Sequence, residues 1–118
     1  MLAKRSSPRG PAAAFAQSAP VFAALGDETR LRLVARLGSK GPLSIARLTD
    51  GTAVTRQAIA KHLRVLADAG LAHGVRRGRE RLWQLETARL DEARRGLEAM
   101  AQRWDERLGR LKVLVEES

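Results

Sequence analysis

Residues 44–69 contain two short helical patterns separated by a tight turn. Ser44 can cap a brief first helix, and Gly51 lies in the turn that follows it. Thr55 can cap a longer second helix that continues to Ala69. Two helices joined by a short glycine-containing turn form the helix-turn-helix pattern, so the second helix is expected to pack on one side only.

The longer helix, expected at about 55–69, has two chemically distinct faces. A rotation of about 100° per residue separates its apolar side chains from its polar ones. The apolar side is formed by Ile59, Leu63, Leu66 and Gly70, and the polar side by Gln57, Lys61, Arg64 and Asp68. One face can therefore pack in a core while the other stays free for a partner.

An arginine-rich hairpin is expected directly after this helix, at about 72–85. The pattern alternates before and after a glycine turn at Gly78, which is typical of two antiparallel strands. The strands and turn carry four guanidinium groups with only Glu80 among them: Arg76, Arg77, Arg79 and Arg81. So many like charges on a narrow ribbon favour an anionic partner over a merely solvated loop.

The net charge supports the same interpretation. The 118 residues include 22 Lys and Arg against 13 Asp and Glu, which gives a formal net charge of +9. Residues 1–86 hold 15 basic and 6 acidic side chains, whereas residues 87–118 hold 7 of each. The excess therefore lies before the final helix, and it favours a polyanion such as double-stranded DNA.

The rest of the chain is expected to form further helices around this unit. Residues 1–10 form a flexible basic arm and 11–118 a single domain, with helical stretches over 11–25 interrupted near Ser18. A core helix is expected over 28–37, ended by Gly38, with four apolar positions: Leu31, Val34, Ala35 and Leu37. A long helix over about 88–116 carries an apolar stripe suited to association: Leu90, Leu97, Ala101, Trp104, Leu108, Leu111 and Val115.

Candidate DNA contacts follow from these patterns. The first turns of a recognition helix enter the major groove, where Arg pairs with guanine and Gln with adenine. The candidates for base contacts are Arg56, Gln57, Ala60 and Lys61. The candidates for backbone or wing contacts are Thr55, Arg64, Arg76, Arg77, Arg79 and Arg81.

Residues 24–33 (ALGDETRLRL) and 56–66 (RQAIAKHLRVL) resemble the opening helix and the recognition helix of ArsR-type regulators. The hairpin at 76–83 also fits, so the resemblance covers about 21–85. It implies a mainly α winged helix-turn-helix fold with a small β-hairpin, and a repressor that binds an inverted-repeat operator as a homodimer through its N- and C-terminal helices. The expected interface residues are Val21, Phe22, Leu25, Leu97, Ala101, Trp104, Leu108 and Leu111.

The chain departs from the metal-sensing members of that family. It has no cysteine, and its histidines, His62 and His73, lie outside the final helix. We therefore expect no metal and no cofactor, and a structural or phosphate-contacting role for each histidine. We also expect a soluble, cytoplasmic protein without membrane association or enzymatic activity. A protein-interaction module and a nonspecific nucleic-acid binder remain alternatives, and the sequence identifies no inducer.

Overall fold

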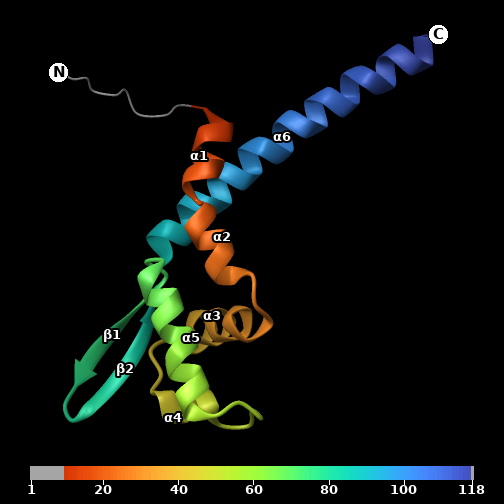
Figure 1. The fold of residues 1–118 in the computed structure, drawn as a ribbon. Helices are drawn as coiled ribbons and strands as arrows, with labels where there is room; N and C mark the ends of the chain where they lie inside the picture. Colours follow the sequence, from red (N-terminus) through yellow and green to blue (C-terminus); the bar gives the residue numbers. More distant parts are fainter. Residues whose placement is uncertain (1–9, 118) are drawn as a thin grey trace, which may run out of the picture.

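The computed structural model describes residues 10–117, which form six helices and one two-stranded antiparallel sheet (Figure 1). The elements are α1 Pro11–Gln17, α2 Ala19–Leu25, α3 Glu28–Lys40, α4 Ile45–Thr49, α5 Arg56–Asp68, β1 Ala72–Arg77, β2 Glu80–Leu85 and α6 Thr87–Glu117. This confirms the mainly α winged helix-turn-helix fold. Apart from Gly10, the basic arm expected over 1–10 lies outside the described residues.

Three of the helices begin at side-chain caps, of which Ser44 and Thr55 are predicted from the sequence. In each, an oxygen of the capping side chain accepts a hydrogen bond from the backbone N–H three residues later, which satisfies a donor that the helix itself leaves unpaired. The pairs are Asp27 with Arg30 at 3.1 Å, Ser44 with Arg47 at 3.2 Å, and Thr55 with Ala58 at 3.1 Å.

The expectation for α3 is wrong in its end and in part of its buried face. The helix passes through Gly38 and continues to Lys40, and Gly41 follows with φ of +82°. Gly38 stays helical where α3 packs on β2, and a Cβ built on it would lie 3.5 Å from the Leu85 side chain. The contacts between α3 and β2 favour the helical conformation here, against the helix-destabilising effect of an interior glycine, which is about 1 kcal/mol.

The core-facing residues of α3 are Leu33 and Leu37, which are buried. Leu31, expected in the core, is 50% exposed, and Ala35 is exposed as well. Val34 packs partly against the core and Leu37 is buried, as expected. The helix is rotated slightly from the expected orientation, so that Leu33 enters the core in place of Leu31.

The hydrophobic core lies where α5 meets α2, α3, α4 and β1. Five large side chains are less than 2% exposed: Leu48, Ile59, Leu63, Leu66 and Leu71. Three of them, Ile59, Leu63 and Leu66, form one side of α5, as its periodicity predicts. The recognition helix is therefore anchored along one face.

The hairpin is fastened to the helix-turn-helix unit by backbone hydrogen bonds. Strands β1 and β2 pair from Ala72 with Leu85 to Arg77 with Glu80, around a turn in which Gly78 has φ of +64°. Leu43 N–H donates to the Trp83 carbonyl at 3.0 Å, and Trp83 N–H donates to the Leu43 carbonyl at 2.7 Å. This bridge joins β2 to the segment before α4 and limits the freedom of the wing.

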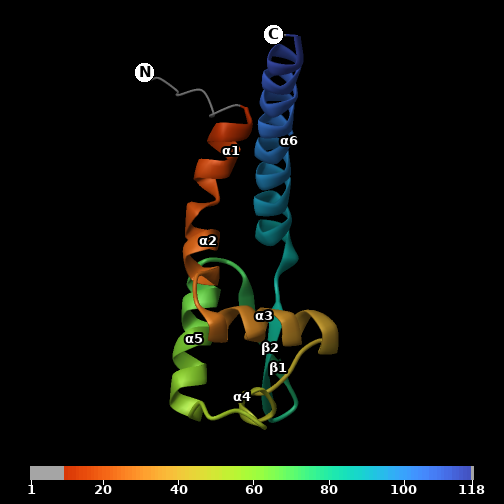
Figure 2. The same ribbon diagram turned by 90° about the vertical axis from the view of Figure 1, so that its right-hand side faces the viewer.

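Helix α6 projects beyond the rest of the molecule. Figures 1 and 2 show α2 and α1 beside the first part and the middle of α6, whereas its last turns extend beyond every other element. Residues 101–117 are all exposed. Within residues 10–117, no helix combines the length and the apolar content that a membrane span requires.

Candidate nucleic-acid interface

Helix α5 presents the polar face that the sequence predicts. Four of its long polar side chains are exposed: Arg56, Gln57, Lys61 and Arg64. Ala60 lies among them and is partly buried. An open concavity of about 450 Å³ runs along this face between Thr55 and Arg64. The arrangement brings together three cations, one amide and a small apolar side chain, which is the chemistry needed to contact base edges and phosphates.

The start of α5 is held in place by Thr55. Its hydroxyl oxygen accepts the Ala58 N–H, and its backbone carbonyl accepts the Ile59 N–H at 3.0 Å. The residue is exposed, so a hydroxyl hydrogen remains available as a donor toward solvent or a phosphate. Thr55 therefore serves as the cap and lies at the exposed N-terminal end of the polar face.

The wing exposes all four of its arginines. Arg76 lies opposite Arg81 across the two strands, and Arg77 lies opposite Glu80. Arg79 occupies the turn beside Gly78. Like charges placed directly opposite each other destabilise a hairpin, and their exposure is consistent with a surface that binds an anion.

Arg81 has a fixed position that sequence reasoning missed. Its guanidinium carbon lies 4.9 Å from the centroid of the Trp83 ring, within the range of a cation–π contact. A Cβ added at Gly74 would lie only 2.9 Å from the Arg81 Nε atom. Gly74 pairs with Trp83 across the sheet, so the glycine leaves room for the stacked guanidinium. The sequence offered one signal of this contact, because a glycine inside a strand, here Gly74, often marks a close approach by another group.

The candidate dimer surface is divided between buried and exposed residues. Val21 is 4% exposed and belongs to the core of the chain, and Phe22 and Leu25 pack partly against that core. Along α6, Leu97 is 43% exposed and Ala101 is exposed as well. Further along the same stripe, three side chains are more than half exposed: Trp104 at 55%, Leu108 at 62% and Leu111 at 55%.

An apolar groove of about 430 Å³ continues this stripe toward the core. Phe22 and Leu25 of α2 line one side, and Leu90, Ala93 and Leu97 of α6 line the other. The stripe and the groove form one apolar surface on α2 and α6.

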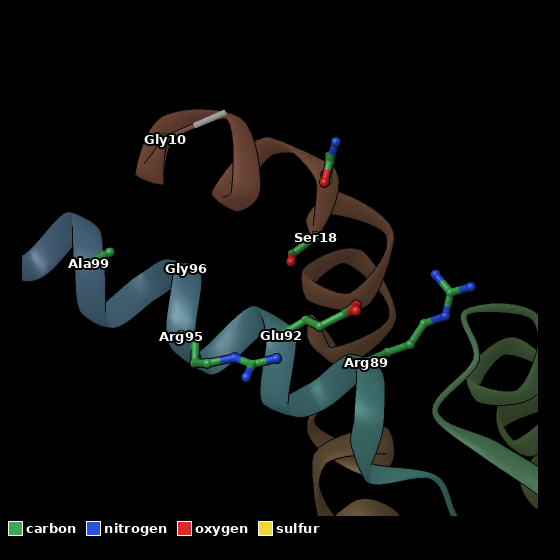
Figure 3. Close-up of a pocket in the computed structure, with 8 residues that line it drawn as sticks. Gly10, Ser18, Arg89, Glu92, Arg95, Gly96 and Ala99 are labelled. Atoms are coloured by element: carbon green, nitrogen blue, oxygen red, sulfur yellow. The ribbon is translucent and has the colours of Figure 1, made fainter. Parts of the chain in front are cut away.

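A second cavity, of about 640 Å³, lies between the α1–α2 junction and α6. Figure 3 shows Ser18 facing α6 across this space, with Glu92 extending into it. Arg89 and Arg95 line it as well, so the cavity combines two positive charges and one negative charge. It lies apart from the α5 face and from the wing.

The polar surface of α6 is organised by ion pairs within the helix. Arg94 donates to Asp91 at 2.7 and 3.0 Å and to Glu98 at 2.9 Å, residues three and four positions away on the same helix. These bonds from Arg94 hold the pKa of Asp91 below its usual value. In the part of the chain that the structure describes, no three His, Asp or Glu side chains are grouped as a metal site would need.

Comparisons with known proteins agree with this fold. A family model described as a helix-turn-helix domain matches residues 25–75. The chain is 43% identical over 68 residues to the uncharacterized HTH-type transcriptional regulator YuzN of Bacillus subtilis (strain 168), covering 52% of this chain and 74% of that protein. It is 37% identical over 75 residues to the HTH-type transcriptional regulator Rv2034 of Mycobacterium tuberculosis (strain ATCC 25618 / H37Rv), covering 64% of this chain and 69% of that protein.

Solved structures show a matching fold over more of the chain. An ArsR-like transcriptional regulator from Rhodococcus sp. RHA1 superposes with a TM-score of 0.73 at 41% sequence identity, covering 85% of this chain and 93% of the other. A second structure, of the ArsR family transcriptional regulator RHA00566, has a TM-score of 0.66 at 27% identity, covering 76% and 92%.

Proposed function

The chain belongs to the ArsR-like helix-turn-helix transcriptional regulators, a class that binds DNA, and from this premise we propose that it is a cytoplasmic, sequence-specific repressor that binds an inverted-repeat operator as a homodimer. The observation that carries the proposal is the exposed polar face of α5 beside a wing with four exposed arginines. The repressor role rests on the family resemblance alone. A protein-interaction module and a nonspecific nucleic-acid binder are the alternatives that the experiment below separates.

Base reading is assigned to the first turns of α5. Arg56 and Lys61 can donate to guanine, and Gln57 can form two hydrogen bonds with adenine. Ala60 can contact a thymine methyl group. All four lie in the first half of the helix, and the three polar ones are exposed. This is the end of a recognition helix that meets base edges in the major groove.

Backbone contacts are assigned to the residues around that face. Thr55 and Arg64 flank the base-reading residues on α5, and the wing adds four arginines: Arg76, Arg77, Arg79 and Arg81. Contacts of this kind fix the register of a protein on the duplex without reading its sequence. Because each neutralised phosphate releases counterions, we expect affinity to fall steeply as salt rises.

Dimerisation is assigned to the apolar surface of α2 and α6. Leu97, Ala101, Trp104, Leu108 and Leu111 carry this assignment together with Phe22 and Leu25, whereas Val21 is already buried within the chain and acts by supporting them. In a twofold dimer the two recognition helices meet successive major grooves about 34 Å apart, which requires an operator with inverted half-sites.

The test is a binding titration by fluorescence anisotropy with the full chain. A labelled duplex from upstream of the gene that encodes the protein is compared with a scrambled duplex of the same composition, at two salt concentrations. We expect the native duplex to bind at least about a hundredfold more tightly, which corresponds to about 3 kcal/mol. Equal binding of both duplexes with a steep salt dependence would indicate a nonspecific binder, and weak binding of both a protein-interaction module.

Two alanine variants distinguish residues that contact bases from residues that contact phosphates. Gln57→Ala removes a proposed base contact, so it should reduce the preference for the native duplex. Arg79→Ala removes a proposed phosphate contact, so it should weaken both duplexes alike and lower the salt slope by about 1. Both residues are exposed, and thermal unfolding should confirm that each variant remains folded. A loss of preference in Arg79→Ala but not in Gln57→Ala would contradict the assignment.

A further inference from the structure

His62, on α5, takes part in a polar cluster that joins three helices. The Arg30 side chain on α3 donates from Nη1 to His62 Nδ1 at 3.2 Å and from Nε to the Ala24 carbonyl of α2 at 2.5 Å. The Asp27 carboxylate, which caps α3, lies 3.9 Å from the same His62 nitrogen. One guanidinium therefore ties the end of α2 to the recognition helix.

The contact between Arg30 and His62 requires a neutral imidazole. Arginine has only donors and keeps its charge throughout the physiological pH range. Nδ1 must therefore offer its lone pair, and the ring proton must be on Nε2. When the ring takes up a second proton, Nδ1 becomes a donor that faces another donor, and two positive charges come together.

Asp27 provides an alternative partner for the protonated ring. Its Oδ2 atom already accepts the Arg30 backbone N–H, and this bond, followed by the nearby charge of His62, holds the pKa of Asp27 below its usual value. The carboxylate is therefore charged wherever histidine titrates. Protonation exchanges a hydrogen bond from Arg30 for an ion pair with Asp27.

Few other charges face the ring in the described residues. Of the acidic groups in residues 10–117, Asp27 is the one within 4.0 Å of His62. The α2 side contributes the uncharged Ala24 carbonyl, and the charged neighbours of His62 on α5, Lys61 and Arg64, are exposed on its polar face. The His62 side chain itself is only 22% exposed.

We propose that Arg30 and His62 are positioning residues that hold the recognition helix against the α2–α3 junction. Protonation of His62 exchanges the Arg30 hydrogen bond for the Asp27 ion pair, which shifts the recognition helix from its DNA-binding position and weakens operator binding. The inference rests on the proposed function of α5 in reading DNA. Helix α2 leads into the proposed dimer surface, so the link also connects that surface to the reading helix.

The direction of the effect is diagnostic. Added positive charge on a DNA-binding protein strengthens its attraction to every duplex as the pH falls. Loss of the Arg30 hydrogen bond has the opposite effect on operator binding, because it shifts the recognition helix from its binding position. If His62 is nine-tenths protonated and only the neutral form is competent, operator affinity falls about tenfold, while binding of a scrambled duplex does not weaken.

The experiment follows His62 by NMR and DNA affinity by anisotropy, at pH 7.5 and at the lower pH where the ring is nine-tenths protonated. His62→Asn retains an acceptor near the Nδ1 position but does not titrate. It should bind the operator like the wild type at pH 7.5 and lose the acid sensitivity. His73→Asn is the matched control, because His73 is the other histidine and lies 3.4 Å from Glu86 on the wing side. It should retain the acid sensitivity.

The outcomes separate this link from the proposed function. Equal acid sensitivity in the wild type and in His62→Asn, or its loss in His73→Asn, would overturn the link. If the wild type shows no operator preference at pH 7.5, the proposed function fails, and the free protein still tests the link. In the free protein, protonation of His62 should shift the backbone amide signals of Ala24–Gly26 and of α5. A pH titration that leaves these signals unchanged would overturn the link between Arg30 and His62. Thermal unfolding of both variants shows that they are folded.

Discussion

Leu108→Ala tests the proposed homodimer at a side chain that contributes little to the fold of one chain. Leu108 is 62% exposed on the projecting part of α6. Burying a whole leucine side chain stabilises by about 1.5–3 kcal/mol, so covering the exposed part gives about 1–2 kcal/mol per protomer. In a twofold dimer both copies of Leu108 are covered, so this contribution occurs twice. Allowing for the methyl group that alanine retains, we expect a loss of about 2 kcal/mol, or roughly 30-fold in the dimer dissociation constant.

The assay is a dilution series followed by sedimentation and by tryptophan fluorescence. The chain has two tryptophans, of which Trp83 is 8% and Trp104 55% exposed, so Trp104 dominates any change on association. Its emission should shift to longer wavelength as the dimer dissociates, and the midpoint should move to higher protein concentration in Leu108→Ala.

Val113→Ala is the matched control for this prediction. Val113 lies on the same helix and is 50% exposed, but five residues separate it from Leu108, which places it about 140° away around the helix. We expect its dimer midpoint to match that of the wild type. Equal weakening by both substitutions, or no weakening by Leu108→Ala, would refute the assignment of this face to the interface.

Three further predictions concern the stability of the fold. Leu63→Ala empties a fully buried site, so denaturant unfolding should show a loss of about 2–5 kcal/mol, against less than about 1 kcal/mol for Val65→Ala, which is 37% exposed. Thr55→Ala removes the cap of α5 and should cost about 1 kcal/mol in the same measurement, with a loss near zero contradicting the cap. The Arg30 backbone N–H and the charge of His62 lower the pKa of Asp27 from its usual 3.8, so its stabilisation is present above that pH and lost as the pH falls through the lower folded value. Asp27→Asn should therefore flatten the acid side of the stability curve below about pH 4, and an unchanged acid-unfolding midpoint would contradict this.

The elements of this protein were readable from the sequence because they depend on neighbours a few residues apart. The caps at Asp27, Ser44 and Thr55 each bond to a backbone group three residues away. The apolar period of α5 predicts which of its side chains are buried, and the alternation around Gly78 predicts the hairpin. The candidate DNA-contacting residues follow from those local patterns.

The tertiary structure decided what depends on contacts between distant residues. Periodicity shows that α3 has an apolar face, but only packing against α5 and β2 selects Leu33 and leaves Leu31 exposed. From the sequence, Gly38 predicts the end of a helix. In the structure, α3 continues past Gly38, which lies near Leu85 of β2. Only the folded chain shows that Val21 belongs to the core of a single protomer.

The side-chain contacts around the wing and the polar face of α5 also depend on residues far apart in the sequence. Arg81 lies over Trp83 because Gly74 on the paired strand leaves space for it. Arg30 meets His62 although 32 residues separate them in the sequence. The sequence by itself therefore determined which elements form and where the charge lies, because these follow from local hydrogen bonds and hydrophobic period. Only the folded chain decided how the elements rotate and which polar groups meet, because those depend on packing between segments far apart in the sequence.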